Sequence, residues 1–249
     1  MAVSENILPA VIGHRGACGH APENTLASLR AAAALGAGWV EFDVKLTADD
    51  KMIILHDNDL DRTTTGSGLV AARNLAEIRK LDAGVWFDES FRGEMVPTLD
   101  DYLSVLHELR LGAVVEIKPT PGREVETGRL VAAHLAAHWP GDRPAPLLCS
   151  FKPASLVAAR EAAPALERAI LLSSPGDDWR RIAEGVGAPA VHCNHMNLTR
   201  ARAAEILQAG YALRCYTVNE KAQASTLFDW GVEGVITDYP DRMPTRSAT

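Results

Sequence analysis

Two acidic residues, Glu41 and Asp43, stand two positions apart in an otherwise apolar run of the sequence. In a β-strand, this spacing directs both side chains to the same face. Two carboxylates held together away from water repel each other, and a shared proton or a bound cation relieves the repulsion. A third carboxylate, Glu116, lies near the end of a later run. Three carboxylates with open coordination positions suit Mg²⁺ or Ca²⁺, whereas an outward-facing acidic pair is the alternative interpretation.

Two histidines, His14 and His56, close other short apolar runs and are candidates for an acid–base pair. An imidazole titrates near neutral pH, so it can give or take a proton without much tuning. Arg15 and Lys118 stand close to these groups in the sequence and supply positive charge. Arginine can hold phosphate oxygens through paired hydrogen bonds, and lysine can act as a point charge. Either histidine alone is more often an ordinary core or surface residue, so only the combination indicates chemistry.

These residues fall at the ends of short β-rich runs, and most of the runs are followed by a helix-like segment. This alternation predicts parallel strands joined by helices. The eight predicted strands are Val11 to Arg15, Trp39 to Val44, Ala113 to Lys118, Leu147 to Ser150, Ala169 to Leu172, Ala190 to Cys193, Ala212 to Val218 and Gly234 to Thr237. In a parallel α/β barrel, functional side chains gather at the carboxyl ends of the strands. We therefore expect the candidate residues to meet at one end of the molecule.

Helix boundaries can be predicted where a capping residue precedes helical spacing and a glycine follows it. Such pairs are Thr98 with Gly112, Thr199 with Gly210, and Asn219 with Gly231. The alternation of strand and helix breaks once, between His56 and Pro97. Met52 to His56 is predicted to form a further short strand, and we interpret about residues 57–97 as an insertion that acts as a partial lid.

The composition describes an acidic globular protein. The chain has 249 residues, of which 47% are hydrophobic, and 25 basic against 32 acidic residues give a net charge of −7. No linker or low-complexity tract divides it, so we predict one domain over residues 1–249. Without a basic run, nucleic acid and anionic membranes are not expected partners. An anionic substrate would require positive charge gathered at one place.

The cysteines and the apolar segments bear on location. The four cysteines are widely separated and form no C-x-x-C pair, which is typical of a reducing compartment. The first residues resemble no secretion signal, and no apolar stretch approaches the roughly 18 residues that a membrane span needs. We predict a cytoplasmic protein without stable membrane association. The sequence leaves its oligomeric state undefined.

One acidic motif can be excluded as a calcium site. Asp57, Asp59 and Asp61 alternate like the start of an EF-hand loop. The sixth position of that loop is a glycine and the twelfth a glutamate, but this chain has Arg62 and Gly68 there.

Taken together, the motifs resemble the glycerophosphodiester phosphodiesterase family. The matching segments are His14-Arg15-Gly16, Pro22-Glu23-Asn24-Thr25, Glu41-Phe42-Asp43-Val44, His56-Asp57, Pro97-Thr98-Leu99, Glu116-Ile117-Lys118, Tyr216-Thr217-Val218-Asn219 and Thr237-Asp238. They follow in order from about residue 11 to residue 240. Residues 116–120 and 193–195 are similar to the soluble cytoplasmic bacterial branch. The family often has tryptophan where this chain has Tyr216.

The resemblance implies a TIM (β/α)₈ barrel with a small insertion after the second strand. It also implies hydrolysis of a small-molecule glycerophosphodiester to sn-glycerol 3-phosphate and an alcohol, with one divalent cation, Mg²⁺ or Ca²⁺, as cofactor. By motif, the implied metal ligands are Glu41, Asp43 and Glu116, the implied acid–base pair is His14 and His56, and the implied phosphate-binding residues are Arg15 and Lys118. A cyclic phosphate intermediate and direct attack by water both remain open, as does the identity of the head-group alcohol.

Two other functions fit parts of the same pattern. A metal-assisted lyase or aldolase would use three carboxylates and a lysine, but it leaves the histidines without a joint task. A non-enzymatic protein that senses glycerophosphodiesters would need no matched acid and base.

Overall fold

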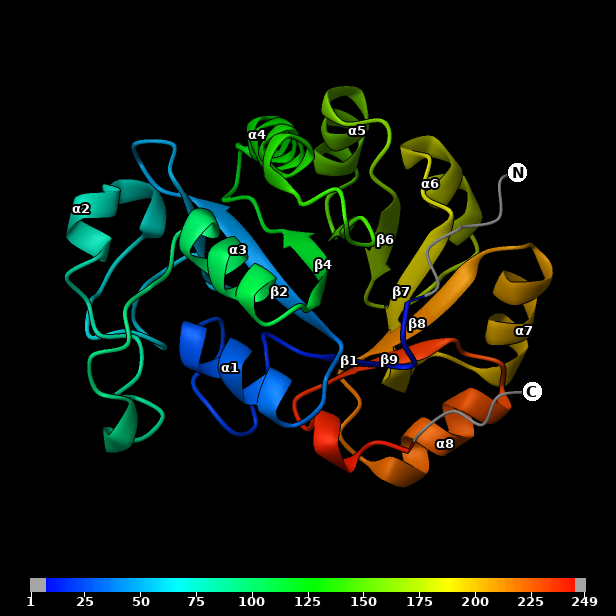
Figure 1. Ribbon diagram of the computed structural model, residues 1–249. Coiled ribbons are helices and arrows are strands. Elements are labelled where there is room, and N and C mark those ends of the chain that lie inside the picture. The colour runs from blue at the N-terminus through cyan, green and yellow to red at the C-terminus, as the bar shows by residue number, and fades with distance from the viewer. Residues whose placement is uncertain (1–7, 245–249) are drawn as a thin grey trace.

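The computed structural model describes residues 8–244, and its centre is a closed ring of eight parallel strands (Figure 1). These strands are β1 (Val11–Gly13), β2 (Trp39–Leu46), β4 (Gly112–Ile117), β5 (Leu147–Ser150), β6 (Arg168–Leu172), β7 (Ala190–Asn194), β8 (Ala212–Tyr216) and β9 (Gly234–Thr237). Each pairs with the next in chain order, and β1 pairs with both β2 and β9, which closes the ring. The predicted TIM barrel is confirmed.

Helices connect successive strands around the outside of the ring (Figure 1). They are α1 (Leu26–Ala34), α3 (Leu99–Glu108), α4 (Glu124–His138), α5 (Pro153–Ala162), α6 (Trp179–Val186), α7 (Arg200–Gln208) and α8 (Lys221–Asp229). After β9, the described part of the chain forms only a 3₁₀ turn at Pro240–Arg242. No helix within residues 8–244 combines the length and apolar character needed to cross a membrane.

Two of the three predicted helix caps are present. Thr98 and Thr199 each accept a hydrogen bond from a backbone N–H in the first turn of α3 and α7. The third prediction, Asn219, is wrong, because the residue that caps α8 is Glu220. The Asn219 side chain instead donates to Asp238 and accepts from Thr237.

All eight residues of β2 are buried, so the strand buries both of its faces. Val40, Phe42 and Val44 pack in the layer between the barrel and its helices. Trp39 belongs to the core inside the barrel. The two-residue period therefore points Glu41, Asp43 and Lys45 inward as well. Buried charged groups need partners, and the partners of Glu41 and Asp43 define the site below.

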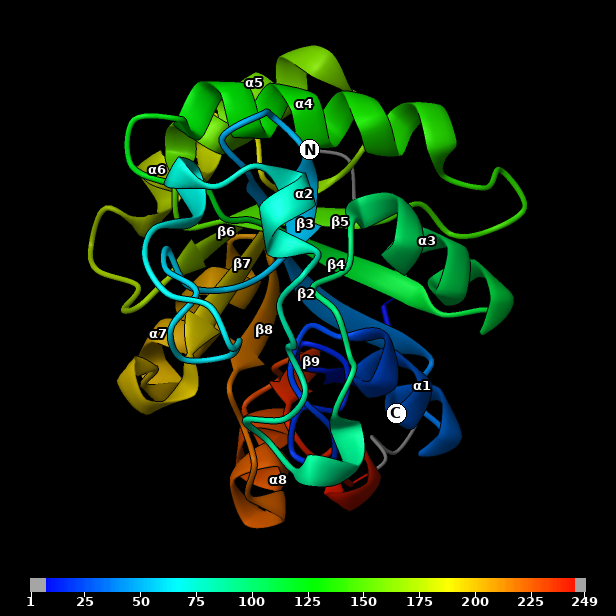
Figure 2. The same ribbon diagram turned by 90° about the vertical axis from the view of Figure 1, so that its left-hand side faces the viewer.

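The insertion follows a reversal of the chain at the end of β2. Strand β3 (Met52–Ile54) pairs antiparallel with Val44–Leu46, which confirms the extra strand. The segment then forms 3₁₀ turns at Val70–Ala72 and Glu89–Phe91 around the short helix α2 (Leu75–Ile78). It has a small core of its own, made of Ile53, Leu55, Leu60, Val70, Ile78, Ala83 and Val96. Figure 2 looks from this side and shows the insertion crossing in front of the barrel strands.

Candidate active site

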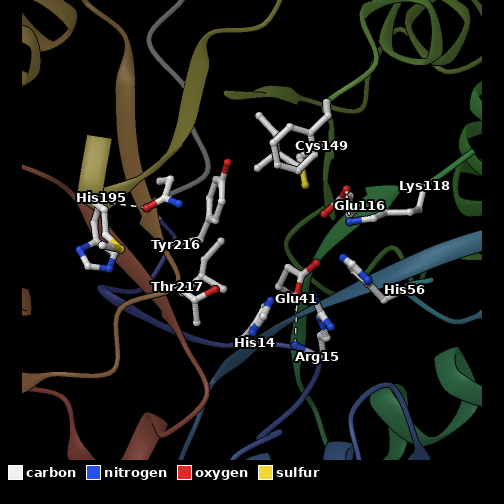
Figure 3. Close-up of a pocket in the computed structure, with 15 residues that line it drawn as sticks. His14, Arg15, Glu41, His56, Glu116, Lys118, Cys149, His195, Tyr216 and Thr217 are labelled. Atoms are coloured by element: carbon white, nitrogen blue, oxygen red, sulfur yellow. Dashed lines mark hydrogen bonds and ion pairs between the residues drawn. The ribbon is translucent and has the colours of Figure 1, made fainter. Parts of the chain in front are cut away.

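The three predicted carboxylates meet inside the barrel. Glu41 and Asp43 project from β2, and Asp43 is paired in register with Glu116 of β4. All three residues are buried, and they offer oxygen atoms that lie within 4.8 Å of one another. Figure 3 shows Glu41 and Glu116 facing the same pocket. The pairing of adjacent parallel strands brings together carboxylates that lie more than seventy positions apart in the sequence.

The electrostatics of this cluster show carboxylates that lack sufficient counter-charge. Burial, with repulsion from Asp43 and Glu116, raises the pKa of Glu41 well above its ordinary value. Burial and the nearby Asp43 raise the pKa of Glu116 to about 7. Burial also acts to raise the pKa of Asp43, but Lys118 and Arg15 outweigh it and hold that pKa low.

One oxygen of the cluster is open. Asp43 Oδ1 is buried and makes no hydrogen bond, although Lys118 Nζ lies 3.3 Å away. Clustered carboxylate oxygens, one of them without a hydrogen bond, form the donor set that a hard divalent cation takes. The residues present therefore fit such an ion.

The two histidines lie at separate strand ends and face one cavity of about 360 Å³. His14 Nδ1 lies 2.6 Å from Asp238 Oδ1, and His56 Nδ1 lies 2.6 Å from Asp57 Oδ1. With Nδ1 donating to a carboxylate, Nε2 of each ring is left to exchange protons. Burial, together with Arg15 and Lys118, lowers the pKa of His56.

Both predicted cations sit among the carboxylates. Arg15 donates from its backbone N–H to Glu41 Oε2 at 3.1 Å and from Nη1 to Glu23 Oε1 at 2.6 Å. Lys118 Nζ lies 2.8 Å from Glu116 Oε1. Arg15 adopts a left-handed conformation with φ of +49°, which is costly for a residue other than glycine and is held here by surrounding contacts.

The opposite wall of the cavity is aromatic and polar. Tyr216, Thr217 and His195 lie across the pocket from His56 and Lys118 (Figure 3). The Tyr216 hydroxyl donates to the Leu172 carbonyl oxygen at 3.0 Å, and its ring meets Phe151 edge to face at 5.8 Å. Tyrosine therefore builds part of an aromatic wall at this position.

A second cavity, of about 400 Å³, adjoins the first. The two share His56, Glu116, Lys118 and Phe151. The insertion contributes Asp57, Asn58 and Asp59 to the wall of the second cavity.

The sequence patterns assign no role to several supporting residues. Asp238 directly follows the last predicted strand, so the strand-end rule that selected His14 could have selected it. Asn24 donates to Asp43 Oδ2 at 2.9 Å from a loop, where no periodic pattern indicates its direction. Phe151 follows β5, and its place in the sequence does not distinguish it from a core residue.

Fold and site together define an enzyme built on a TIM barrel. The model of the glycerophosphoryl diester phosphodiesterase family matches residues 14–242. The chain belongs to this family and is an enzyme of that class.

Similar proteins support the assignment over more than nine-tenths of the chain. A glycerophosphodiester phosphodiesterase of Bacillus subtilis is 34% identical over 92% of this chain and 83% of its own length. One from Caldanaerobacter subterraneus is 32% identical over 94% of this chain and 95% of its own length. The structure of an Oleispira antarctica phosphodiesterase in complex with the product sn-glycerol-3-phosphate is 37% identical, covers 95% of both chains and has a TM-score of 0.92.

Proposed function

We propose that this protein hydrolyses glycerophosphodiesters to sn-glycerol 3-phosphate and an alcohol, using one divalent cation, Mg²⁺ or Ca²⁺, and two histidines. Family membership favours this reaction over the lyase and sensor alternatives. A cytoplasmic location stays a prediction from the sequence.

The observation that carries the proposal is the matched pair of histidines on one cavity. Each ring has its Nδ1 at 2.6 Å from a carboxylate, and the two rings come from different strand ends. Two imidazoles oriented in this way can act as proton acceptor and proton donor on one substrate. A protein that only binds its ligand gains nothing from such a pair.

In the proposed reaction, His14 takes the proton of the glycerol hydroxyl next to the phosphate, and that oxygen attacks phosphorus. His56 gives its proton to the departing alcohol. Water then opens the cyclic glycerol phosphate while the two histidines exchange roles. Direct attack by water, with His14 as the base, is the competing route.

Arg15 and Lys118 are proposed to hold the phosphate oxygens and to stabilise the charge that builds up on them. Glu41, Asp43 and Glu116 are proposed to hold the cation, which supplies Lewis-acid stabilisation of that charge when bound. Glu41, Asp43 and Glu116 cluster beside Arg15 and Lys118, so a bound divalent ion would offset the negative charge of the carboxylates. An acidic protein would then present a positive pocket to an anionic substrate.

A ³¹P NMR time course on glycerophosphodiesters with different head groups tests the proposal. We expect sn-glycerol 3-phosphate to appear with Mg²⁺ or Ca²⁺ and its release to stop when a chelator is added. His14→Ala and His56→Ala should each lower turnover about 10²–10⁴-fold. His20→Ala is the matched control, because His20 pairs with Asp241 and lies outside both cavities.

Three results would contradict the proposal in separate parts. Unchanged turnover in the presence of chelator would refute the proposed metal dependence. Near-wild-type rates in both histidine variants would refute the proposed acid–base pair. A substrate without the neighbouring glycerol hydroxyl should not react, and full activity on it would favour direct attack by water.

A further inference from the structure

The insertion sends one side chain to both halves of the proposed machinery. Arg62 binds two carboxylates, Glu23 and Asp57, and each of these also holds a residue of the site. We propose that Arg62 is a positioning residue that holds Arg15 and His56 in a defined relative position. This inference rests on the proposed function and goes beyond the family assignment.

The first arm of this contact runs to the phosphate-binding side. Arg62 donates from Nη1 to Glu23 Oε2 and from Nη2 to Glu23 Oε1, both at 2.8 Å. The same Oε1 accepts from Arg15 Nη1 at 2.6 Å. Burial acts to raise the pKa of Glu23, but hydrogen bonds and charge from the two arginines outweigh it and lower that pKa. Glu23 therefore stays ionised between them.

The second arm runs to the acid–base side. Arg62 donates from Nε to Asp57 Oδ2 at 2.6 Å and from Nη2 to Asp57 Oδ1 at 3.1 Å. Asp57 Oδ1 also faces His56 Nδ1. The hydrogen bonds from Arg62 hold the pKa of Asp57 low, so this carboxylate remains an acceptor that fixes the ring of His56.

Arginine is the residue type suited to this task. Its planar guanidinium offers five N–H donors in a rigid fork, and here three nitrogens contact two carboxylates at once. Exposed ion pairs by themselves contribute little to stability, and the Arg62 side chain is 44% exposed. Its partners are less exposed, at 11% for Glu23 and 23% for Asp57. The expected effect is therefore on the position of the reacting groups rather than on overall stability.

The other two aspartates of the motif excluded as a calcium site form hydrogen bonds within the loop that carries Arg62. Asp59 Oδ1 accepts from the Asp61 N–H at 3.3 Å, and Asp61 Oδ2 accepts from the Gly68 N–H at 2.9 Å. These bonds shape the loop that presents Arg62. Arg62 and Asp61 belong to neither set of cavity-lining residues, so Arg62 acts through Glu23 and Asp57 rather than on the substrate.

The test compares Arg62→Gln with Arg92→Gln in the steady-state hydrolysis of one glycerophosphodiester. Arg92 also donates twice to one carboxylate, that of Glu89, but it lies in a remote part of the insertion. We expect kcat/KM to fall about 10- to 100-fold in Arg62→Gln, because small displacements of reacting groups are costly in rate. Arg92→Gln should remain within twofold of wild type.

Single and double variants separate the two arms. Glu23→Gln should mainly raise KM through Arg15, and Asp57→Asn should mainly lower kcat through His56. Adding Arg62→Gln to Asp57→Asn should cost less than Arg62→Gln costs alone, since the two changes break one contact. Guanidinium ions added to Arg62→Ala should restore part of the lost activity. Arg62→Lys should be less active than the wild type, because an ammonium group lacks the planar fork of donors.

If the wild type is active and Arg62→Gln keeps kcat and KM, the inference is wrong and the proposed function stands. A lower melting temperature with unchanged kcat and KM would equally overturn it, because that is the signature of a purely structural contact. If the wild type releases no glycerol phosphate, the proposed function is wrong. Binding of sn-glycerol 3-phosphate then decides on Arg62: weaker binding in Arg62→Gln than in Arg92→Gln supports its role, and equal binding refutes it.

Discussion

The substitution Asp238→Asn tests how the negative charge of Asp238 affects the function of His14. Asp238 Oδ1 faces His14 Nδ1 at 2.6 Å, and Oδ2 accepts from Asn219 Nδ2 at 2.6 Å. The Cys18 thiol also donates to Oδ1, at 2.9 Å. An asparagine of the same shape cannot serve both His14 and Asn219. If its amide nitrogen faces His14, the ring must carry its proton on Nε2 and cannot act as a base. If its amide nitrogen faces Asn219 instead, two N–H₂ groups meet.

The structure sets the size of the effect. Asp238 and His14 are part-buried, with side chains 25% and 17% exposed, and a hydrogen bond to a charged group contributes about 1.5–3 kcal/mol. Because about 1.4 kcal/mol corresponds to a tenfold change in rate and the pair is part-buried, kcat should fall by at least about 10-fold. KM should change little, since Asp238 does not line either cavity.

A coupled assay of sn-glycerol 3-phosphate release measures both constants. Asp241→Asn is the matched control, because it removes the charge from another Asp–His pair, at 2.8 Å from His20, outside the cavities. A kcat for Asp238→Asn within twofold of wild type would refute the reasoning. So would an equal loss in the control, which would indicate a general effect of removing negative charge.

Three further predictions concern stability. Gly16→Ala should lower the melting temperature, because Gly16 has φ of +88° and an added Cβ would lie 2.1 Å from Ser28 Oγ. Because Gly16 follows Arg15 in the chain, the same change should also raise KM. An unchanged melting curve would contradict this prediction. Burial and Arg214 lower the pKa of His192, so below pH 6.5 the unfolded chain binds a proton that the folded chain does not, and stability falls as pH falls. His192→Leu should remove up to about 1.4 kcal/mol of the loss between pH 7.5 and 5.5, measured by urea unfolding, and identical pH dependence in both proteins would refute it. Mg²⁺ or Ca²⁺ at a hundredfold excess over its Kd should stabilise the wild type by about 2.7 kcal/mol and Glu116→Gln by less, and an equal gain would argue against a site at Glu116.

The positions of the strands could be predicted because each is a short, β-rich run between polar or glycine-containing segments. The errors fall at strand ends. The sequence predicts a first strand that extends to Arg15, but β1 ends at Gly13 because Arg15 turns into a left-handed conformation. The helix cap assigned to Asn219 failed for a related reason, since a tertiary partner, Asp238, competes for its side chain.

The candidate site was predictable where one strand carries several groups, as with Glu41 and Asp43. Period-two spacing requires their common direction, and the pairing of β2 with β4 adds Glu116. Contacts across long stretches of sequence carry no such signal. His14 and Asp238 are 224 positions apart, and Arg62 reaches Glu23 across 39 positions from an irregular segment. Only the folded chain makes these partners neighbours.

The pairing of β1 with β9 makes enzymatic activity a measure of barrel closure during folding. His14 stands at the end of the first strand and its carboxylate partner directly after the last, so the pair forms only once the ring has closed. A refolding intermediate with most helices formed but β1 and β9 still unpaired would show strong circular dichroism and little turnover. Recovery of activity should therefore lag behind recovery of helical signal, and the delay would measure the time needed to join the two ends of the sheet.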